Sequence, residues 1–118
     1  MDELLDRLVA KVGVERSVAE KAVGIILAFL LKEGPSDKVQ SLIDQMPGAE
    51  TAAQAAASEG GGGMGGIMGV GTKLMAAGLG MDQMQGVTRE IIAYAREKAG
   101  EDTVGEIVGS IPGLGQFV

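Results

Sequence analysis

Signals that end helices recur along this chain at a spacing of 65 residues. Shifting the sequence by that distance places capping residues on capping residues and apolar residues on apolar residues. The matched pairs are Gly13 and Gly78, Ser17 and Asp82, Ile26 and Ile91, Phe29 and Tyr94, Asp37 and Asp102, Val39 and Val104, and Pro47-Gly48 and Pro112-Gly113. Two such units usually pack face to face, because neither covers its apolar side alone. We therefore predict an all-α fold of two pseudo-repeated helical units, each of about three helices, rather than a chance likeness.

The first unit, residues 1–59, carries its own helix signals. Apolar spacing predicts a helix over 2–12, which Gly13 ends in the left-handed conformation. Ser17 and Glu20 have the spacing of a capping box for a helix over 18–33, which Gly34-Pro35 ends. Ser36 or Asp37 is expected to cap a third helix that ends at Met46. The alanine-rich segment 49–59 predicts a weak helix whose order depends on tertiary contacts.

A glycine-rich run separates this unit from the second one. Residues 60–66 hold six glycines and one methionine, which indicates a flexible linker. The second unit, residues 67–118, is expected to begin with a helix over 67–77, which ends near Gly78 or Gly80. Asp82 is expected to cap a long helix that reaches Ala99, and Gly100 to end it. Asp102 is then expected to cap a last helix that reaches Ile111. The chain is predicted to form a single helical domain.

The composition leaves few residue types for catalysis. The 118 residues include no His and no Cys, which removes imidazole bases, thiolate nucleophiles and the usual zinc ligands. No serine lies in a G-x-S-x-G turn, and the adjacent carboxylates Glu101 and Asp102 are explained by the favourable interaction of negative charge with a helix start. The glycine run follows no predicted strand and contains no phosphate-binding motif. We expect no catalytic residue, no cofactor and no metal site.

The charge and hydropathy patterns bear on partners and compartment. A net charge of −6 without any basic run argues against nucleic-acid binding. The longest apolar run, residues 22–31, is half as long as the roughly 20 residues that a membrane span needs. The chain starts with acidic residues where a signal peptide would be basic. These patterns predict a cytoplasmic protein without membrane contact.

Five of the seven methionines lie close together in the sequence. They are Met64, Met68, Met75, Met81 and Met84. Methionine fills irregular cores and forms adaptable contact surfaces, which is our interpretation here. Thioethers also bind Cu(I), so copper handling is an alternative. Ile67 beside Met64 and Met68 resembles a membrane-touching loop, although only Lys73 supplies the expected basic charge.

Comparison of the two long helices indicates a candidate interface. Gly24, Ala28 and Leu31 share one helix face, and the matching face of the second unit carries Arg89, Ala93 and Arg96. The helix over 22–31 is therefore apolar nearly all round, and such a helix is normally buried. Either the other unit or a second chain is expected to cover this face. We favour the second chain, and therefore a homo-oligomer.

Several short motifs resemble those of a known family. They are Met46-Pro47-Gly48 and Ile111-Pro112-Gly113 after short helices, the central glycine-rich stretch, Gly78-Leu79-Gly80-Met81 before a long helix, and Tyr94 before Gly100. From Gly13 to the C-terminus the chain resembles a bacterial family of small helical proteins of unknown function, the VcgC/VcgE-like group. The resemblance implies an all-α fold and no particular activity.

These observations predict a non-enzymatic protein that acts through protein contacts. The leading hypothesis is an interaction or scaffold module whose partner is a second copy of itself. A carrier of a small apolar ligand or lipid is an alternative, because facing helical units can enclose an apolar pocket. An enzyme of unrecognised type is a further alternative.

Overall fold

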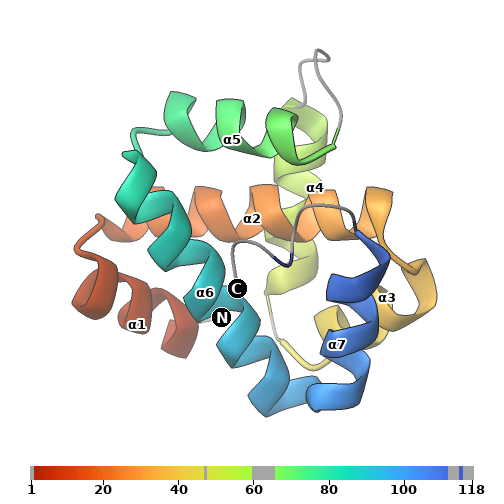
Figure 1. Ribbon diagram of the computed structural model, residues 1–118. Helices are drawn as coiled ribbons and strands as arrows, with labels where there is room; N and C mark the ends of the chain where they lie inside the picture. The colour runs from red at the N-terminus through yellow and green to blue at the C-terminus, as the bar shows by residue number, and fades with distance from the viewer. Residues whose placement is uncertain (1, 47, 60–65, 112–114, 116–118) are drawn as a thin grey trace.

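The computed structural model describes residues 2–46, 48–59, 66–111 and 115. Side chains are described for all of these residues except 57–59 and 66–68. In the described part of the chain the regular structure is all α-helical, as predicted (Figure 1). The helices are α1 (Asp2–Val12), α2 (Arg16–Glu33), α3 (Ser36–Asp44), α4 (Ala49–Glu59), α5 (Gly66–Ala76), α6 (Met81–Ala99) and α7 (Glu101–Ser110).

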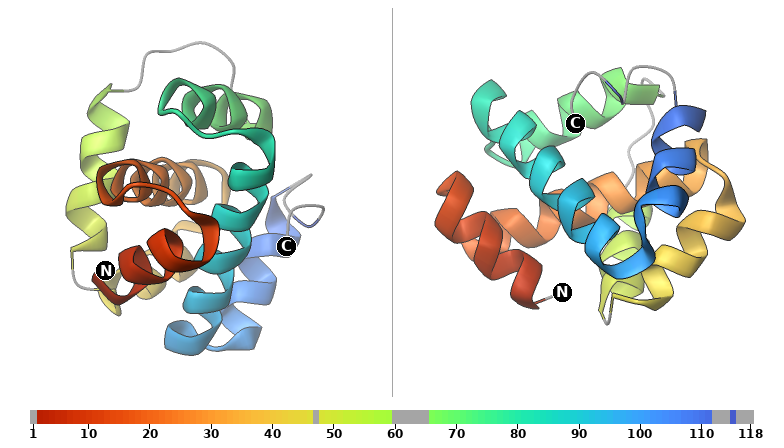
Figure 2. Two further views of the ribbon diagram at one scale, coloured as in Figure 1. Left: turned by 90° about the vertical axis from the view of Figure 1, so that its left-hand side faces the viewer. Right: turned by 60° about the horizontal axis from the view of Figure 1, so that its bottom comes forward.

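Helix α2 lies at the centre, and most other helices pack on it. Helices α1, α4 and α5 contact it from different sides, while α6 crosses it and α3 follows it through a short turn (Figures 1 and 2). The first helix, α1, packs on α6, and α5 packs on α2. The core is mainly aliphatic and also contains Phe29 and Tyr94. Its fully buried members include Leu8, Leu27, Leu42, Ile91 and Ile107.

Three of the predicted helix ends are confirmed by their backbone angles. Gly13, Gly78 and Gly100 have φ angles of +81°, +107° and +93°, in the region that favours glycine. Gly34 differs, because its φ of −93° and ψ of −179° are those of extended backbone. Pro35, which has no N–H and cannot continue a helix, therefore explains the end of α2.

The predicted N-caps are wrong by one or two residues. Ser17, Asp82 and Asp102 each lie one residue inside a helix, and Glu15, Gly80 and Gly100 occupy the caps. Their carbonyls open the helices, as in the bond that the Ala19 N–H donates to the Glu15 carbonyl oxygen at 2.8 Å. The carboxylates of Asp82 and Asp102 lie in the first turns, where negative charge interacts favourably with the helix dipole.

The third helix and the turn after it show the same displacement. Pro35, rather than Ser36 or Asp37, is the N-cap of α3, and the helix ends at Asp44, two residues before the predicted end. The Gln45 and Met46 N–H groups donate to carbonyl oxygens of the last turn, which closes the helix earlier. In the predicted Pro47-Gly48 turn, Gly48 has a φ of +89°, and Pro47 lies outside the described residues.

The alanine-rich segment forms a helix over the predicted range. In α4, Ala49 and Ala53 are buried, and the helix packs across α2 (Figures 1 and 2). The following segment was predicted to be a linker over 60–66. Gly66 is the first residue of α5, and residues 60–65 lie outside the described residues.

Candidate protein-interaction surfaces

Gly24, the first residue of the predicted interface, is buried within the monomer by α4. A Cβ atom at Gly24 would stand 2.4 Å from the backbone oxygen of Ala52 and 3.4 Å from the Ala56 Cβ. The absence of a side chain therefore lets α2 and α4 approach closely. The element that covers this face belongs to the same chain. It is α4, rather than the second unit or a second chain that the sequence led us to expect.

The other two residues of that face are only partly covered. Ala28 and Leu31 are half-buried, and Leu31 packs against the core cluster. The three predicted interface residues therefore share one side of α2 but not one environment. Gly24 is inaccessible to a second chain, whereas Ala28 and Leu31 retain some accessible surface.

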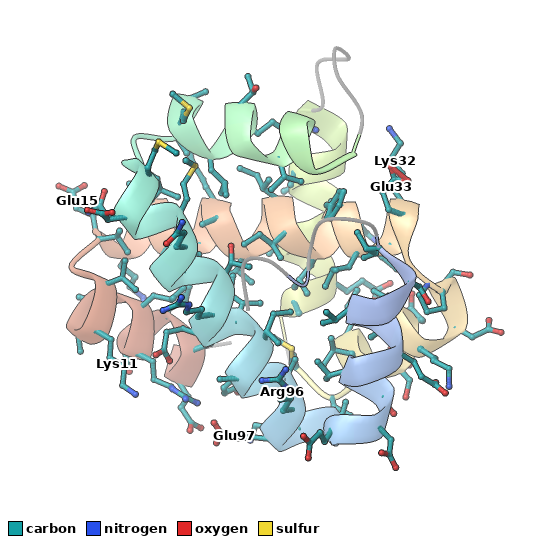
Figure 3. All side chains as sticks on the ribbon, in the orientation of Figure 1. Lys11, Glu15, Lys32, Glu33, Arg96 and Glu97 are labelled. Carbon is teal, nitrogen blue, oxygen red and sulfur yellow. The ribbon has the colours of Figure 1, made fainter. Side chains whose placement is uncertain are left out.

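The matching face of α6 is open to solvent. Arg89 and Arg96 are exposed, and Ala93 between them is half-buried. Figure 3 shows Arg96 projecting from the outer side of α6. Neither arginine forms an ion pair with another described residue. This face therefore presents two available cations on an acidic protein.

Two methionines form an exposed apolar patch at the turn between α5 and α6. Met75 in the last turn of α5 is 61% exposed, and Met81 at the start of α6 is 72% exposed. Met84, one turn further along α6, is half-buried against the core. Figure 3 shows sulfur atoms gathered around this turn. Of the other clustered methionines, Met64 lies outside the described residues, and the Met68 side chain is not among those described.

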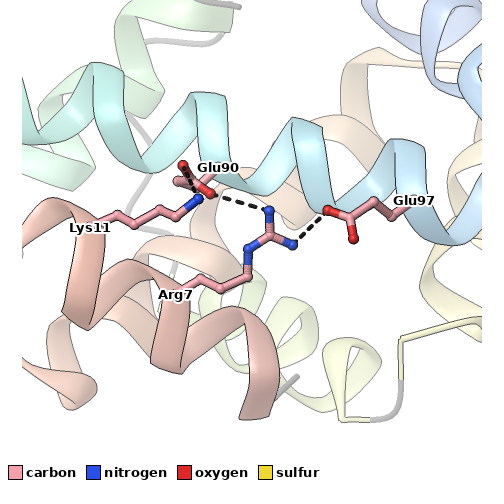
Figure 4. Close-up of polar contacts among 4 residues, drawn as sticks. All are labelled: Arg7, Lys11, Glu90 and Glu97. Carbon is pink, nitrogen blue, oxygen red and sulfur yellow. Dashed lines mark hydrogen bonds and ion pairs between the residues drawn. The ribbon is translucent and has the colours of Figure 1, made fainter.

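A network of charged side chains joins α1 to α6 (Figure 4). The Arg7 Nη1 donates to Glu97 Oε2 at 2.7 Å, and Arg7 Nη2 lies 3.5 Å from Glu90 Oε2. Lys11 Nζ is 3.8 Å from Glu90 Oε1. The hydrogen bond to Glu97, assisted by the nearby carboxylates, raises the pKa of Arg7. Glu90 Oε2 is buried and accepts no hydrogen bond from a described residue, so it depends on the charge of Arg7.

The same arginine also stacks on an aromatic ring. Arg7 Cζ lies 5.7 Å from the centroid of the Tyr94 ring, and Lys98 Nζ lies 5.3 Å from it. Cations at such distances are attracted by the ring quadrupole. Sequence reasoning missed this network, because Arg7 and Glu97 are 90 residues apart and only the packing of α1 on α6 brings them together. We interpret the network as a structural tie between two helices.

The adjacent carboxylates Glu101 and Asp102 lie at one end of α7, and Ser110 lies at the other. Glu101 and Asp102 occupy the exposed first turn of α7. The Ser110 hydroxyl donates to the Glu106 carbonyl oxygen at 2.8 Å, within its own helix. Among the described residues, no three His, Cys, Asp or Glu side chains gather as metal ligands would. None of the described helices has the length and apolarity that crossing a membrane requires.

Comparisons of the chain with protein-family models, with curated proteins and with solved structures find no match. The resemblance to the VcgC/VcgE-like group therefore stays a prediction. The surfaces described above are the basis for a functional proposal.

Proposed function

We propose that this chain is a non-enzymatic protein-interaction module that associates with a second copy of itself. The observation that carries this proposal is the patch formed by Met75 and Met81, which are 61% and 72% exposed on either side of one turn. Large apolar side chains grouped at a protein surface are typical of contact sites. Methionine suits such a site, because its flexible and polarizable side chain adapts to the surface that it meets.

A second copy of the chain can supply the apolar surface that this patch would contact. In a two-fold symmetric contact the same surface of both copies is used, so a residue on one copy meets a different residue on the other. Met75 of each copy would then face Met81 of its neighbour. The contact is thus apolar on both sides, and two copies bury it together.

We also propose that the chain is built from two copies of one helical unit. Helices α2 and α6 begin at residues 16 and 81, and α3 and α7 begin at 36 and 101, so both pairs are 65 residues apart. The packing is reciprocal as well: α1 lies on α6, and its counterpart α5 lies on α2. These observations support residues 1–59 and 67–118 as related units. Helix α4, at the end of the first unit, packs on α2.

Sedimentation velocity over a range of concentrations tests the association. The variant with both Met75→Gln and Met81→Gln removes the apolar patch but keeps the side-chain length. We expect its dissociation constant to rise about tenfold, which corresponds to about 1.4 kcal/mol. Val9→Gln, at another exposed apolar residue, is the control and should leave the constant unchanged.

Two results would contradict the proposal. A wild-type chain that stays monomeric at every concentration removes self-association. An equal loss in the Val9 control shows that the methionine patch is not the contact surface.

A further inference from the structure

The face of α6 that carries Arg89 and Arg96 is open to solvent, whereas the equivalent face of α2 is partly covered by α4. On α2, Gly24 is buried beneath α4 and its neighbours Ala28 and Leu31 are half-buried. On α6, the residues 65 positions later are Arg89, Ala93 and Arg96, and both arginines are exposed without an ion pair to a described residue. The covered face thus carries small and apolar residues, and the open face carries cations.

The arginines have a fixed geometry along α6. Residues seven apart lie two helical turns from one another on the same side of a helix, with the residue at the intermediate position between them. Ala93 occupies that position and is small, so the surface between the two cations is shallow. A helix that carries carboxylates at the same spacing would match both arginines at once.

Helix α3 of the same protein carries such a face. Asp37, Ser41 and Asp44 have the spacing of Arg89, Ala93 and Arg96, and all three are exposed. Asp44 Oδ1 accepts a hydrogen bond from Gln40 at 3.0 Å, and no described cation pairs with either aspartate. A small residue, Ser41, lies between the carboxylates. The two faces are therefore complementary in charge, in spacing and in the small size of the central residue.

We propose that the Arg89–Arg96 face of α6 in one copy binds the Asp37–Asp44 face of α3 in a second copy. This proposal rests on the proposed self-association and specifies how two copies are oriented. The arginine face lies on the helix that begins at Met81, one of the two residues of the methionine patch. Exposed ion pairs contribute little affinity individually, and their role here is to select one orientation and to accelerate encounter. Burial of the methionines supplies the apolar part of the contact.

Charge reversal tests the proposal directly. One variant carries Arg89→Glu and Arg96→Glu, and another carries Asp37→Lys and Asp44→Lys. Each variant places like charges across the contact, so each should self-associate about tenfold more weakly at low salt. A dimer of one copy of each variant has two α3–α6 contacts. In one contact the reversed face of α6 meets the reversed face of α3, so the charges are again opposite. In the other contact the unchanged arginine face meets the unchanged aspartate face. The mixture should therefore associate about as strongly as the wild type.

A third variant is the matched control. Lys21→Glu together with Lys32→Glu makes the same change in net charge as the arginine variant, at exposed residues of α2. Its association should change less than about twofold. Circular dichroism of every variant establishes that the helices are retained. The wild-type association should also weaken as salt is raised.

The outcomes separate this proposal from the one on which it rests. If the methionine variant dissociates while the charge-reversed variants behave as the control, the α3–α6 contact is overturned and self-association stands. If mixing the reversed variants does not restore association, the two faces do not meet. If the wild type is monomeric throughout, both proposals fail.

Discussion

Gly24 and Ala52 bring α2 and α4 closer together than any side chain at residue 24 would permit. A Cβ at Gly24 would stand 2.4 Å from the Ala52 oxygen, far inside van der Waals contact, and that oxygen belongs to backbone that cannot rotate away. The contact explains how an alanine-rich helix stays on α2. Small residues on both sides allow the two backbones to approach, so many weak dispersion contacts form together.

The first prediction concerns this contact. Gly24→Ala should lower the free energy of unfolding by about 2 kcal/mol, because overpacking exceeds the roughly 1 kcal/mol that alanine gains in helix propensity. Urea denaturation measures the change. Gly71→Ala is the control, since Gly71 lies inside α5 with no atom within 4 Å of its added Cβ. The control should be neutral or slightly stabilising, and a Gly24 variant as stable as this control would contradict the close approach.

The second prediction concerns the tie between α1 and α6. Arg7→Ala should cost about 1–2 kcal/mol, because it leaves the buried Glu90 Oε2 without its nearest cation. Arg16→Ala is a matched control, since Arg16 also pairs with two carboxylates, Asp2 and Asp6, but is half exposed. It should cost less than about 1 kcal/mol. Equal losses in urea denaturation would show that the Arg7 network is an ordinary surface pair.

The third prediction concerns the dependence of this tie on pH. The hydrogen bond to Glu97 raises the pKa of Arg7. A group whose pKa is raised by folding adds to the free energy of unfolding. The full contribution is present below the unfolded-state pKa, and it is lost only as the pH rises through the folded-state pKa. For arginine both pKa values lie far above the physiological pH range. The stability difference between the wild type and Arg7→Ala should therefore be equal at about pH 7 and pH 9, and a decline over that range would place the pH dependence in another group.

The fourth prediction concerns the junction between α6 and α7. Gly100 has φ +93° and ψ 154°, a conformation that side chains other than glycine rarely adopt. Gly100→Ala should therefore destabilise the chain by about 1–3 kcal/mol. Gly105→Ala, in the interior of α7 with open space around the added Cβ, should stabilise it by up to about 1 kcal/mol. Thermal unfolding of the two variants should show shifts of opposite sign.

Much of the fold could be predicted because local signals and tertiary packing agree. Apolar spacing and glycine stops placed α1 correctly, and Gly78 and Gly100 mark ends that need a positive φ. The caps were misplaced because a polar side chain near a helix start can act from the first turn as well as from the cap. Asp82 is an example, and the backbone carbonyls of Glu15 and Gly80 open the helices where Ser17 and Asp82 were predicted to cap them.

The surfaces could be predicted only in part, because they depend on what covers each helix. The sequence predicted that the face of Gly24 is covered. It did not predict that α4 covers this face, because the alanine-rich helix has few large apolar side chains. Its alanines work through close approach, which depends on backbone geometry rather than on side-chain size. The pairing of Arg7 with Glu97 left no local signal at all. The exposure of Met75 and Met81 likewise depends on how α5 meets α6.

The last prediction tests whether α4 is held only by its packing on α2. An isolated helix of eleven residues is marginal in water, so loss of packing should unfold α4 locally. Ala53→Asp places a charge at a buried position, whereas Ala55→Asp places the same charge at an exposed one. Hydrogen exchange should report loss of amide protection across α4 in the first variant, with α2 and α6 still protected. The second variant should keep its protection.

Combining this change with Gly24→Ala provides a stricter test. If both substitutions act by releasing α4, the second substitution has little further effect. The free energy of unfolding of the double variant should then lie within about 0.5 kcal/mol of that of the less stable single variant. Changes that act independently would add in full. Full additivity, or loss of protection in α2 as soon as Ala53 is replaced, would show that α4 is an inseparable part of the core. In that case its alanines would stabilise the whole fold rather than one helix.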